Sequence, residues 1–519
     1  MLVLEQSKAL ILKLKNPGKI LNVIPTAKQI HIQGQDFVVV PHKFDEVKVL
    51  RNIGIKAPAP ILHYYDWPGR YKPFKHQRLT SAFLTMYPKC LVLNQIGTGK
   101  TMSALWAADY LMKKKLVKKV LILSPLSTLE RVWADAVFLD FPHRRSVVLH
   151  GTAEKRKRLL NTEADFYIIN HDGFNIIAKE ANDMFDLVIV DEAAVLRNPS
   201  TTRFKVINKW LTNNVNTRLW LMTGTPTPNE PTDAWALAKL VNSPYIPVTR
   251  ALFRDQVMIK IGNYKYVPKP NATEIASSVM HPAIRFTRDD CLDLPPTVLQ
   301  VREAKLTKEQ EEHYALMWKH LVTEVKNGGS ITAANEAVKI QKLVQIALGT
   351  AYGTDGRTIQ LDCKPRVDAV REVLDEADGP VIVFVPLTGV LHMLARELSK
   401  NYTVAVVNGE VSASKRNEIF SDFQEKKKYK VLLAHPATMA HGLTLTAAST
   451  VVWYGPINSN EIYTQANGRI ERIGKKFSSL VVHIEGTAIE RKMYQRLENK
   501  QSLQGLLLDM ISQEQEKVL

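Results

Sequence analysis

Residues 91–101, with the sequence LVLNQIGTGKT, hold side chains suited to phosphate chemistry. Gly97 and Gly99 can take backbone conformations closed to other residues, so the loop N–H groups can turn towards an anion. Lys100 would then reach the β- and γ-phosphates of a nucleotide, and the Thr101 hydroxyl would bind Mg²⁺. This stretch therefore predicts a phosphate-binding loop for ATP.

The loop departs from the usual motif at its first position, where Asn94 stands in place of glycine. The alternative interpretation is a chance match in a surface turn. The flanks favour the phosphate loop, because an apolar run precedes it and the helix-compatible residues 102–111 follow it. We therefore count Asn94 and Thr98 among the residues that bind the nucleotide.

A pair of acids, Asp191 and Glu192, follows the apolar residues 187–190. A carboxylate at the carboxyl end of a parallel strand, beside a phosphate loop, is the usual arrangement for holding Mg²⁺. We expect Asp191 to hold the metal through water, and Glu192 to orient and deprotonate the attacking water. Two acids after a strand are a weak signal alone, and the loop before them makes the signal strong.

Gln77 closes the stretch YKPFKHQ at residues 71–77, ahead of an apolar helix at residues 79–86. Its amide carries both a donor and an acceptor, so it could bind the edge of adenine. The alternative is an ordinary surface glutamine.

Buried-type strands alternate with helical segments between residues 91 and 226, which predicts an α/β fold with a doubly wound parallel sheet. Residues 229–362 lose this rhythm, and we expect helical insertions and a hinge there. The alternation then resumes in a second α/β lobe without a glycine-rich loop, so the two lobes are expected to share one nucleotide. The expected strands of that lobe lie at residues 381–385, 403–407, 430–433, 450–453 and 480–483.

Residues 1–65 form a separate pattern, with a hairpin around Gly34 and a helix at residues 44–52. Pro58 and Pro60 end it in a short, stiff joint. We predict a small N-terminal α+β accessory module at 1–65, a first lobe with a helical insertion at 66–296, and the hinge, second lobe and C-terminal helix at 297–519.

Basic residues exceed acidic ones, with 69 Lys and Arg against 51 Asp and Glu and a formal net charge of +18. This excess predicts a polyanionic partner, of which nucleic acid is the commonest. Charge alone does not separate nucleic acid from an anionic membrane. The N-terminus lacks an uninterrupted apolar core, and the most apolar run, residues 381–395, is too short to span a bilayer. We expect a cytoplasmic protein with no membrane partner.

The stretch QANGRIERIG at residues 465–474 resembles a motif of superfamily 2 helicases and translocases, in the Swi/Snf-like branch. The resemblance covers about residues 66–500 and includes the phosphate loop and the acid pair. Further motifs match in order: ILSPLSTLERVW (122–133), LMTGTPTPN (221–229), Leu294-Pro-Pro, VNGEVSASKR (407–416), HGLTLTAA (441–448) and GTAIE (486–490). The resemblance implies two RecA-like lobes with helical insertions.

Arg469 and Arg472 stand three residues apart, so on a helix they would share a face. The resemblance implies that Arg472 is an arginine finger, that Arg469 is its close partner, and that Gln465 binds the nucleotide. Such a finger stabilises charge on the transferring phosphoryl group and ties hydrolysis to lobe closure. The alternative for the arginine pair is a solvated helix face.

The chain departs from the family pattern at Ala194, where a histidine is usual, and at Thr444 and Lys475. The loss of that histidine puts the coupling between the acid pair and the next motif in doubt. His171 follows a strand where the family contacts DNA, although a lone histidine there is more often structural. Three basic clusters could track phosphates or be solvated surface: Lys113–Lys119, Lys155–Arg158 and Lys426–Lys428.

The expected function is an ATP- and Mg²⁺-dependent translocase on double-stranded DNA that remodels branched DNA by branch migration, fork regression or strand annealing. The chain resembles compact annealing and branch-migration helicases of bacteria and phages. The alternatives are a strand-separating RNA or DNA helicase, a translocase that displaces proteins from DNA, and an ATPase switch without movement. Duplex and branched DNA are the expected partners, with replication or recombination proteins as further candidates, in the nucleoid of a bacterial or phage-infected cell.

Overall fold

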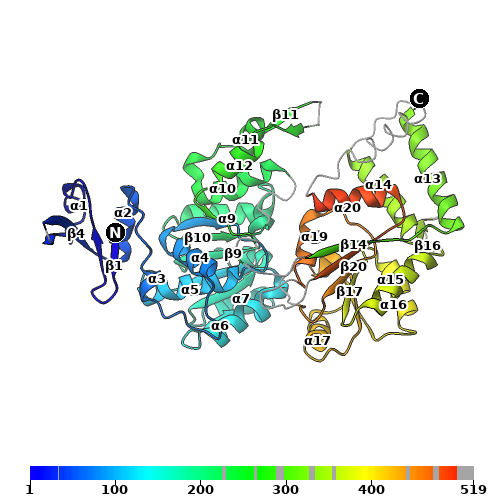
Figure 1. The fold of residues 1–519 in the computed structure, drawn as a ribbon, viewed down its shortest axis with the longest axis horizontal. Helices are drawn as coiled ribbons and strands as arrows, with labels where there is room; N and C mark the ends of the chain where they lie inside the picture. The colour runs from blue at the N-terminus through cyan, green and yellow to red at the C-terminus, as the bar shows by residue number, and fades with distance from the viewer. Residues whose placement is uncertain are drawn as a thin grey trace. The chain divides into compact units, whose positions relative to one another are not determined.

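The computed structural model divides into two compact units, Met1–Cys291 and Leu292–Leu519 (Figure 1). It describes residues 1–32, 34–224, 230–261, 266–287, 291, 297–326, 333–352, 358–439, 445–470 and 479–499. The predicted Arg472, Thr444, Lys475 and Leu294-Pro-Pro lie outside these residues.

The first unit is built on a seven-stranded sheet whose strands run parallel, in the order β13-β5-β10-β9-β6-β8-β7. The strands are β5 (Lys89–Val92), β6 (Val120–Ser124), β7 (Ser146–Val148), β8 (Phe166–Asn170), β9 (Leu187–Asp191), β10 (Arg218–Met222) and β13 (Ala283–Ile284). The central strands are nearly all apolar and fully buried, as expected of a parallel sheet covered on both faces.

Two hydrophobic cores cover the two faces of this sheet. One face carries α4 (Lys75–Met86), α5 (Lys100–Lys113) and α6 (Asp135–Asp140). The opposite face carries α7 (Ala153–Leu160), α8 (Phe174–Ile177), α9 (Thr202–Asn213), α10 (Ala234–Asn242), α11 (Arg250–Val257) and α12 (Ala272–Val279). The hairpin of β11 (Met258–Lys260) and β12 (Tyr266–Pro268) follows α11.

The N-terminal module, residues 1–65, has a four-stranded antiparallel sheet in the order β1-β2-β4-β3. Its elements are β1 (Leu2–Leu4), β2 (Ala9–Leu12), α1 (Gly18–Leu21), β3 (Lys28–Ile32), β4 (Gln35–Pro41), α2 (Phe44–Asn52) and α3 (Ile61–Tyr64). The predicted hairpin and the helix at residues 44–52 are both present. Ala57, Ala59, Ile61 and Tyr65 are buried in the same apolar core as α4 and α5, so the predicted joint is packed into the first unit.

The second unit has a six-stranded parallel sheet in the order β14-β21-β20-β17-β19-β18. Its strands are β14 (Val298–Glu303), β17 (Val381–Phe384), β18 (Val404–Val407), β19 (Val431–Ala434), β20 (Thr450–Trp453) and β21 (Leu480–Glu485). The helices are α13 (Lys308–Lys326), α14 (Ala333–Ala347), α15 (Lys364–Glu376), α16 (Thr388–Leu398), α17 (Ala413–Gln424), α18 (Pro436–Met439), α19 (Asn460–Asn467) and α20 (Ala488–Glu498). A small hairpin, β15 (Thr350–Tyr352) and β16 (Thr358–Gln360), follows α14.

The predicted fold class is confirmed, with two parallel α/β sheets and a small antiparallel module. The stretch expected to be helical insertion and hinge also contributes β13 to the first sheet and β14 to the second. Neither strand shows the buried apolar run used to find the others, because β13 has two residues and β14 is largely exposed. Among the described residues, no helix combines the length and apolarity needed to cross a bilayer.

Candidate ATP-hydrolysis site

The phosphate loop links β5 to α5 and has two glycines in left-handed conformations, with φ of 85° at Gly97 and 78° at Gly99. Gly99 is the N-cap of α5. A Cβ at Gly99 would lie 2.1 Å from the Gln77 side-chain nitrogen, so no other residue fits there without displacing Gln77. The loop therefore presents backbone to the N-terminus of α5, where N–H groups and the helix dipole favour an anion.

Lys100 and Thr101 lie in the first turn of α5. The Lys100 ammonium donates hydrogen bonds to the carbonyl oxygens of Asn94, at 3.0 Å, and Gln95, at 3.3 Å. These bonds hold the cation over the loop, at the end of the helix where a phosphate would sit. Both residues occupy the positions that the loop motif predicts.

Asn94 is 1 % exposed and holds the loop from beneath. Its amide nitrogen donates to the Thr80 hydroxyl at 2.9 Å, and its amide oxygen accepts from the Phe286 N–H at 3.0 Å. A glycine could make neither contact. The departure from the usual motif thus ties the loop to α4 and to the segment after β13, and nucleotide binding by Asn94 stays a prediction.

Gln77 is buried on α4 and bonded at both ends of its amide. Its oxygen accepts from the Phe74 N–H at 3.0 Å, and its nitrogen lies 3.3 Å from the Thr98 carbonyl. The neighbouring His76 ring lies 2.9 Å from the same carbonyl oxygen. The ordinary surface alternative is wrong, since Gln77 supports the loop; contact with adenine stays a prediction.

Asp191 ends β9, two strands from the loop-bearing β5 in the sheet order. Its carboxylate accepts from the Ser124 hydroxyl at 3.3 Å, from the Trp133 indole N–H at 3.1 Å and from the Glu192 N–H at 3.1 Å. All three donors are neutral, so they orient the carboxylate without cancelling its charge. That arrangement suits a group that holds a cation.

Glu192 has φ of 49°, a left-handed conformation that is rare for a residue with a Cβ. Such strain costs about 1–3 kcal/mol and persists where the surroundings impose it, often at functional sites. It turns the chain sharply after β9 into the short helical turn Ala193–Leu196. This sharp turn is consistent with Glu192 as the base, which stays a prediction.

Ala194, which replaces the usual histidine, is 1 % exposed and has no polar side-chain atom to pass on a hydrogen bond. The segment after β10 nevertheless reaches the loop through its backbone. The Thr223 N–H donates to the Val92 carbonyl at 3.0 Å. A Cβ at Gly224 would lie 3.4 Å from both the Asn94 oxygen and the Ile96 nitrogen. Close backbone packing thus connects this motif to the loop without the histidine.

The residues present fit Mg²⁺ bound together with ATP. Thr101 supplies a hydroxyl and Asp191 an uncancelled carboxylate, the oxygen ligands that Mg²⁺ prefers alongside water and phosphate. Within the described part of the chain, no three His, Cys, Asp or Glu side chains gather as a separate metal site. A metal held by few protein ligands is what Mg²⁺ sites on nucleotides require.

Sequence reasoning missed Ser124 and Trp133 as site residues. Trp133 is fully buried, and both side chains donate to the Asp191 carboxylate. Both residues could have been singled out from the sequence, because they fall within the family motif ILSPLSTLERVW. Their pairing with an acid about 60 positions later could not be inferred without the sheet order.

In the second unit, Arg469 lies at a different place from the predicted one. Helix α19 ends at Asn467, and Arg469 lies in the following turn rather than on the helix, because its N–H bonds the Ala466 carbonyl three residues back. Its buried guanidinium donates to the Met439 carbonyl at 2.9 Å. The shared helix face is therefore wrong for Arg469, and Arg472 lies outside the described residues. Gln465 is buried on α19, with its amide 3.5 Å from Glu461.

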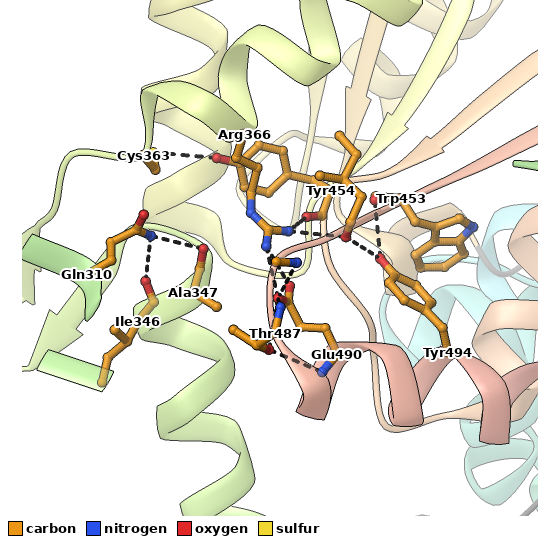
Figure 2. A network of polar contacts seen from close by, with 12 residues as sticks. Gln310, Ile346, Ala347, Cys363, Arg366, Trp453, Tyr454, Thr487, Glu490 and Tyr494 are labelled. Atoms are coloured by element: carbon orange, nitrogen blue, oxygen red, sulfur yellow. Dashed lines mark hydrogen bonds and ion pairs between the residues drawn. The ribbon is translucent and has the colours of Figure 1, made fainter. Parts of the chain in front are cut away.

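A buried ion pair joins α15 to α20 in the second unit (Figure 2). The Arg366 guanidinium lies 2.8 and 3.0 Å from the two carboxylate oxygens of Glu490. It also donates to the carbonyls of Tyr454, after β20, and Ile484, on β21. Glu490 accepts in turn from the Thr487 N–H and hydroxyl, which cap α20. The GTAIE motif thus contributes to a structural ion pair through Glu490.

The three basic clusters are partly engaged with neighbouring side chains. Lys113 lies 3.6 Å from Asp109, Lys157 lies 2.6 Å from Glu180, and Lys426 lies 2.7 Å from Asp422. These contacts support a structural use of those lysines, and DNA contact by the clusters stays a prediction.

His171 is buried, with a ring nitrogen 2.8 Å from the Asp191 carbonyl oxygen. Burial lowers its pKa below the usual value, since the charged ring would lose its hydration. Burial and this contact favour the structural alternative for His171, and DNA contact there stays a prediction.

Comparison with known proteins agrees with this architecture. Residues 76–347 match the family described as the SNF2-related domain, and residues 365–474 match the helicase conserved C-terminal domain. A variant of S. cerevisiae Dbp5 bound to RNA and ADP BeF3 shares the fold at 13 % identity, with a TM-score of 0.50 over 83 % of this chain and 88 % of that chain. The Sulfolobus solfataricus SWI2/SNF2 ATPase core in complex with double-stranded DNA is 21 % identical, with a TM-score of 0.40 over 83 % of this chain and 92 % of that chain.

Curated relatives include a phage protein and longer cellular proteins. Putative protein p41 of Acyrthosiphon pisum secondary endosymbiont phage 1 is 25 % identical over 85 % of this chain and 98 % of its own length. The ISWI chromatin-remodeling complex ATPase CHR11 of Arabidopsis thaliana is 25 % identical, and the uncharacterized ATP-dependent helicase MG018 of Mycoplasma genitalium is 23 % identical, each over 80 % of this chain. The chain spans about two fifths of the length of those two proteins.

Proposed function

The chain belongs to the SNF2-related family of helicase-like ATPases, and we propose that it is an ATP-driven translocase on double-stranded DNA. The observation that carries the proposal is the arrangement at the carboxyl ends of β5 and β9. There a loop with two left-handed glycines holds Lys100 over a helix N-terminus, and neutral donors orient Asp191. These groups can bind and hydrolyse a nucleotide. The excess positive charge of the chain supports a DNA partner.

Each side chain has a separate part in the hydrolysis. Lys100 binds the β- and γ-phosphates and offsets their charge as the bond breaks. Glu192 orients the attacking water and accepts its proton, while Thr101 and Asp191 would hold Mg²⁺. The metal, when bound, neutralises charge that develops on the phosphate oxygens.

Arg472 completes this set as the arginine finger that the family pattern implies. Arg469 has a different part, because its guanidinium is bonded to the Met439 carbonyl and holds the turn from which Arg472 follows. The proposal therefore assigns transition-state stabilisation to Arg472 and positioning to Arg469.

The finer proposal is that the translocase remodels branched DNA by branch migration, fork regression or annealing. A small module packed into the motor unit supports it, because translocation itself needs only the sheets that carry the motifs. The phage origin of one relative fits action in a bacterial or phage-infected cytoplasm. Because the module shares an apolar core with α4 and α5, its complete removal would expose apolar surface; point variants are the better probe.

The test is the ATPase rate with different polymers at fixed salt: blunt duplex, forked DNA, a four-way junction, single-stranded DNA and double-stranded RNA. We expect duplex DNA to stimulate hydrolysis strongly, forks and junctions at least equally, and RNA little. Stronger stimulation by RNA than by DNA would overturn the proposal in favour of an RNA helicase. Fork regression by the wild type then tests the finer proposal.

A further inference from the structure

The sheet of the N-terminal module is apolar on both faces. On one face Leu10, Leu12, Val38 and Val40 are buried. The register pairs Leu10 with Val40 and Leu12 with Val38, so these four share a face. They pack in the same core as residues of α1 and α2. One covered face is all that a small antiparallel sheet needs for its own core.

The opposite face, here called the outer face, is formed by the alternate residues of the same strands. The register pairs Leu2 with Ile11, Ile11 with Val39, and Ile30 with Phe37. Of the large apolar side chains of this face, Leu2 and Ile32 are exposed, and five are partly buried: Leu4, Ile11, Ile30, Phe37 and Val39. Leu2 is 59 % and Ile32 44 % exposed. Within the described residues, none of these seven packs against the module's core.

Antiparallel sheets with one solvated face normally alternate apolar and polar residues along each strand. The outer face breaks that alternation, and apolar side chains gathered on an uncovered face mark a place where another molecule binds. The broken pattern runs across all four strands, which makes it a property of the face rather than of one residue.

The charges of the outer face have one sign. Lys13, just beyond β2, and Lys28, at the start of β3, are exposed. The Lys13 ammonium donates to the Gln35 side chain at 2.7 Å, across the same face. Among the described strand positions of the outer face, none is an aspartate or glutamate. The ligand that fits is both anionic and apolar.

We propose that the outer face of the N-terminal module binds an unpaired strand of DNA. The bases would pack on Phe37 and its aliphatic neighbours, and the phosphates would contact Lys13 and Lys28. Proteins hold single strands without reading sequence by stacking bases on aromatic side chains such as Phe37 and by placing cations along the backbone. This inference rests on the proposed function, because a translocase that remodels branched DNA would encounter unpaired strands.

The other occupants fit less well. Duplex DNA offers phosphates but keeps its base faces stacked inside, so the apolar side chains would gain nothing from it. A second copy of this chain would bring lysines against lysines. An acidic protein segment with apolar side chains shares the chemistry, but no described feature of the motor delivers one to the module.

The experiment measures affinity of the full chain for a fluorescent 20-nucleotide oligo-dT and for a 20-base-pair duplex. Two outer-face variants are compared with the wild type: Phe37→Ser with Ile11→Ser, and Lys13→Ala with Lys28→Ala. The matched control is Lys43→Ala with Lys48→Ala, which removes the same charge from exposed residues at α2. Melting curves of every variant check that the module stays folded.

We expect each outer-face variant to weaken oligo-dT binding by about tenfold, the order of one lost stacking contact. Duplex affinity and duplex-stimulated ATPase should stay within about twofold, and the control should match the wild type. The lysine pair should also lower the slope of log Kd against log salt by about 1.4, at about 0.7 for each single-strand phosphate contact.

Oligo-dT affinity equal to the wild type in both folded outer-face variants would overturn the proposal, and would leave an acidic protein segment as the occupant. An equal loss of oligo-dT and duplex binding would overturn it as well, because the face would then not distinguish unpaired DNA. Failure of the proposed function looks different: duplex DNA would not stimulate the wild-type ATPase, whatever the oligo-dT result.

Discussion

Both units contain a buried carboxylate, Asp191 at the end of β9 and Glu490 in the first turn of α20, and they use these two charges in opposite ways. In the first unit, Asp191 is held by a hydroxyl, an indole N–H and a backbone N–H, so its charge stays uncancelled. In the second unit, Glu490 is paired with Arg366, and both side chains are almost wholly buried. The Asp191 carboxylate can therefore bind a cation, whereas the Glu490 carboxylate holds the fold of the second unit together.

This difference separates a functional charge from a structural one in two units that are both built on parallel sheets. A carboxylate satisfied by neutral donors remains able to hold a cation, because hydrogen bonds orient it and leave its charge in place. A carboxylate satisfied by a buried guanidinium is neutralised, and removing either partner leaves an uncompensated charge. Variants of the first kind should therefore change turnover, and variants of the second kind should change stability.

The largest expected effect separates two arginines of the second unit. Arg472→Ala should lower DNA-stimulated kcat by about 10³-fold or more while ATP affinity and melting temperature stay near the wild type, because a finger acts in the transition state. Arg366→Ala should instead lower the melting temperature, because Glu490 would keep its charge in the core without a counter-ion. A fall in ATP affinity with surviving turnover in Arg472→Ala would show that the finger assignment is wrong.

The next effect tests the first unit. Glu192→Gln keeps the shape of the side chain but removes the base, so kcat should fall by about 10³-fold with ATP still bound. Lys100→Ala should abolish hydrolysis, because nothing then offsets charge on the phosphates. Glu163→Gln, an exposed acid of the same unit, is the matched control and should keep full activity. Near-normal turnover in either site variant would mean that the ATP site is misplaced.

Glu490→Gln tests the buried pair through stability. It should cost about 3–5 kcal/mol, because Arg366 would keep its charge inside the core without a counter-ion. Urea unfolding measures this loss, with Glu372→Gln, an exposed acid on α15, as the control. The double variant Arg366→Gln/Glu490→Gln should lose less than the sum of the two single changes. Simple additivity would contradict a coupled pair.

A smaller effect concerns pH. His483 is fully buried on β21, one of its ring nitrogens lies 2.7 Å from the Tyr463 hydroxyl oxygen, and burial lowers its pKa to about 4. The unfolded chain, with an ordinary histidine pKa, takes up the proton first as pH falls. Stability present above pH 6.5 is therefore lost between about pH 6.5 and 4, by up to about 3 kcal/mol from this residue.

His483→Gln should flatten this pH dependence of urea unfolding, whereas the exposed His392→Gln should leave it as in the wild type. Parallel pH profiles for the wild type and His483→Gln would contradict a neutral buried ring.

Much of the fold followed from the sequence because parallel strands covered on both faces read as short apolar runs between helices. Both parallel sheets were predicted on that basis, whereas the phosphate loop was predicted from its glycines and lysine, and α2 from the helical pattern of residues 44–52. The strands β13 and β14 were not predicted, because β13 is very short and β14 is largely exposed. The helical place of Arg469 was wrong because the residue spacing fits a helix as well as a turn.

The candidate site was harder to predict where partners are distant in the chain. Lys100, Asp191 and Glu192 were found because each follows a strand in a known motif. Trp133, as a donor to Asp191, and the Arg366–Glu490 pair depend on strand order, which one sequence does not give. The hydrogen bonds of Asn94 to α4 and to Phe286 explain why asparagine replaces the glycine of the usual motif.

The most direct test of the central claim is displacement of a third strand from triplex DNA. We expect the wild type to release the labelled third strand from a duplex track when ATP and Mg²⁺ are present, and to release none without ATP. Glu192→Gln should bind the duplex but displace almost nothing. Duplex-stimulated ATP hydrolysis by the wild type without displacement would contradict a translocase and would indicate an ATPase that acts only as a switch.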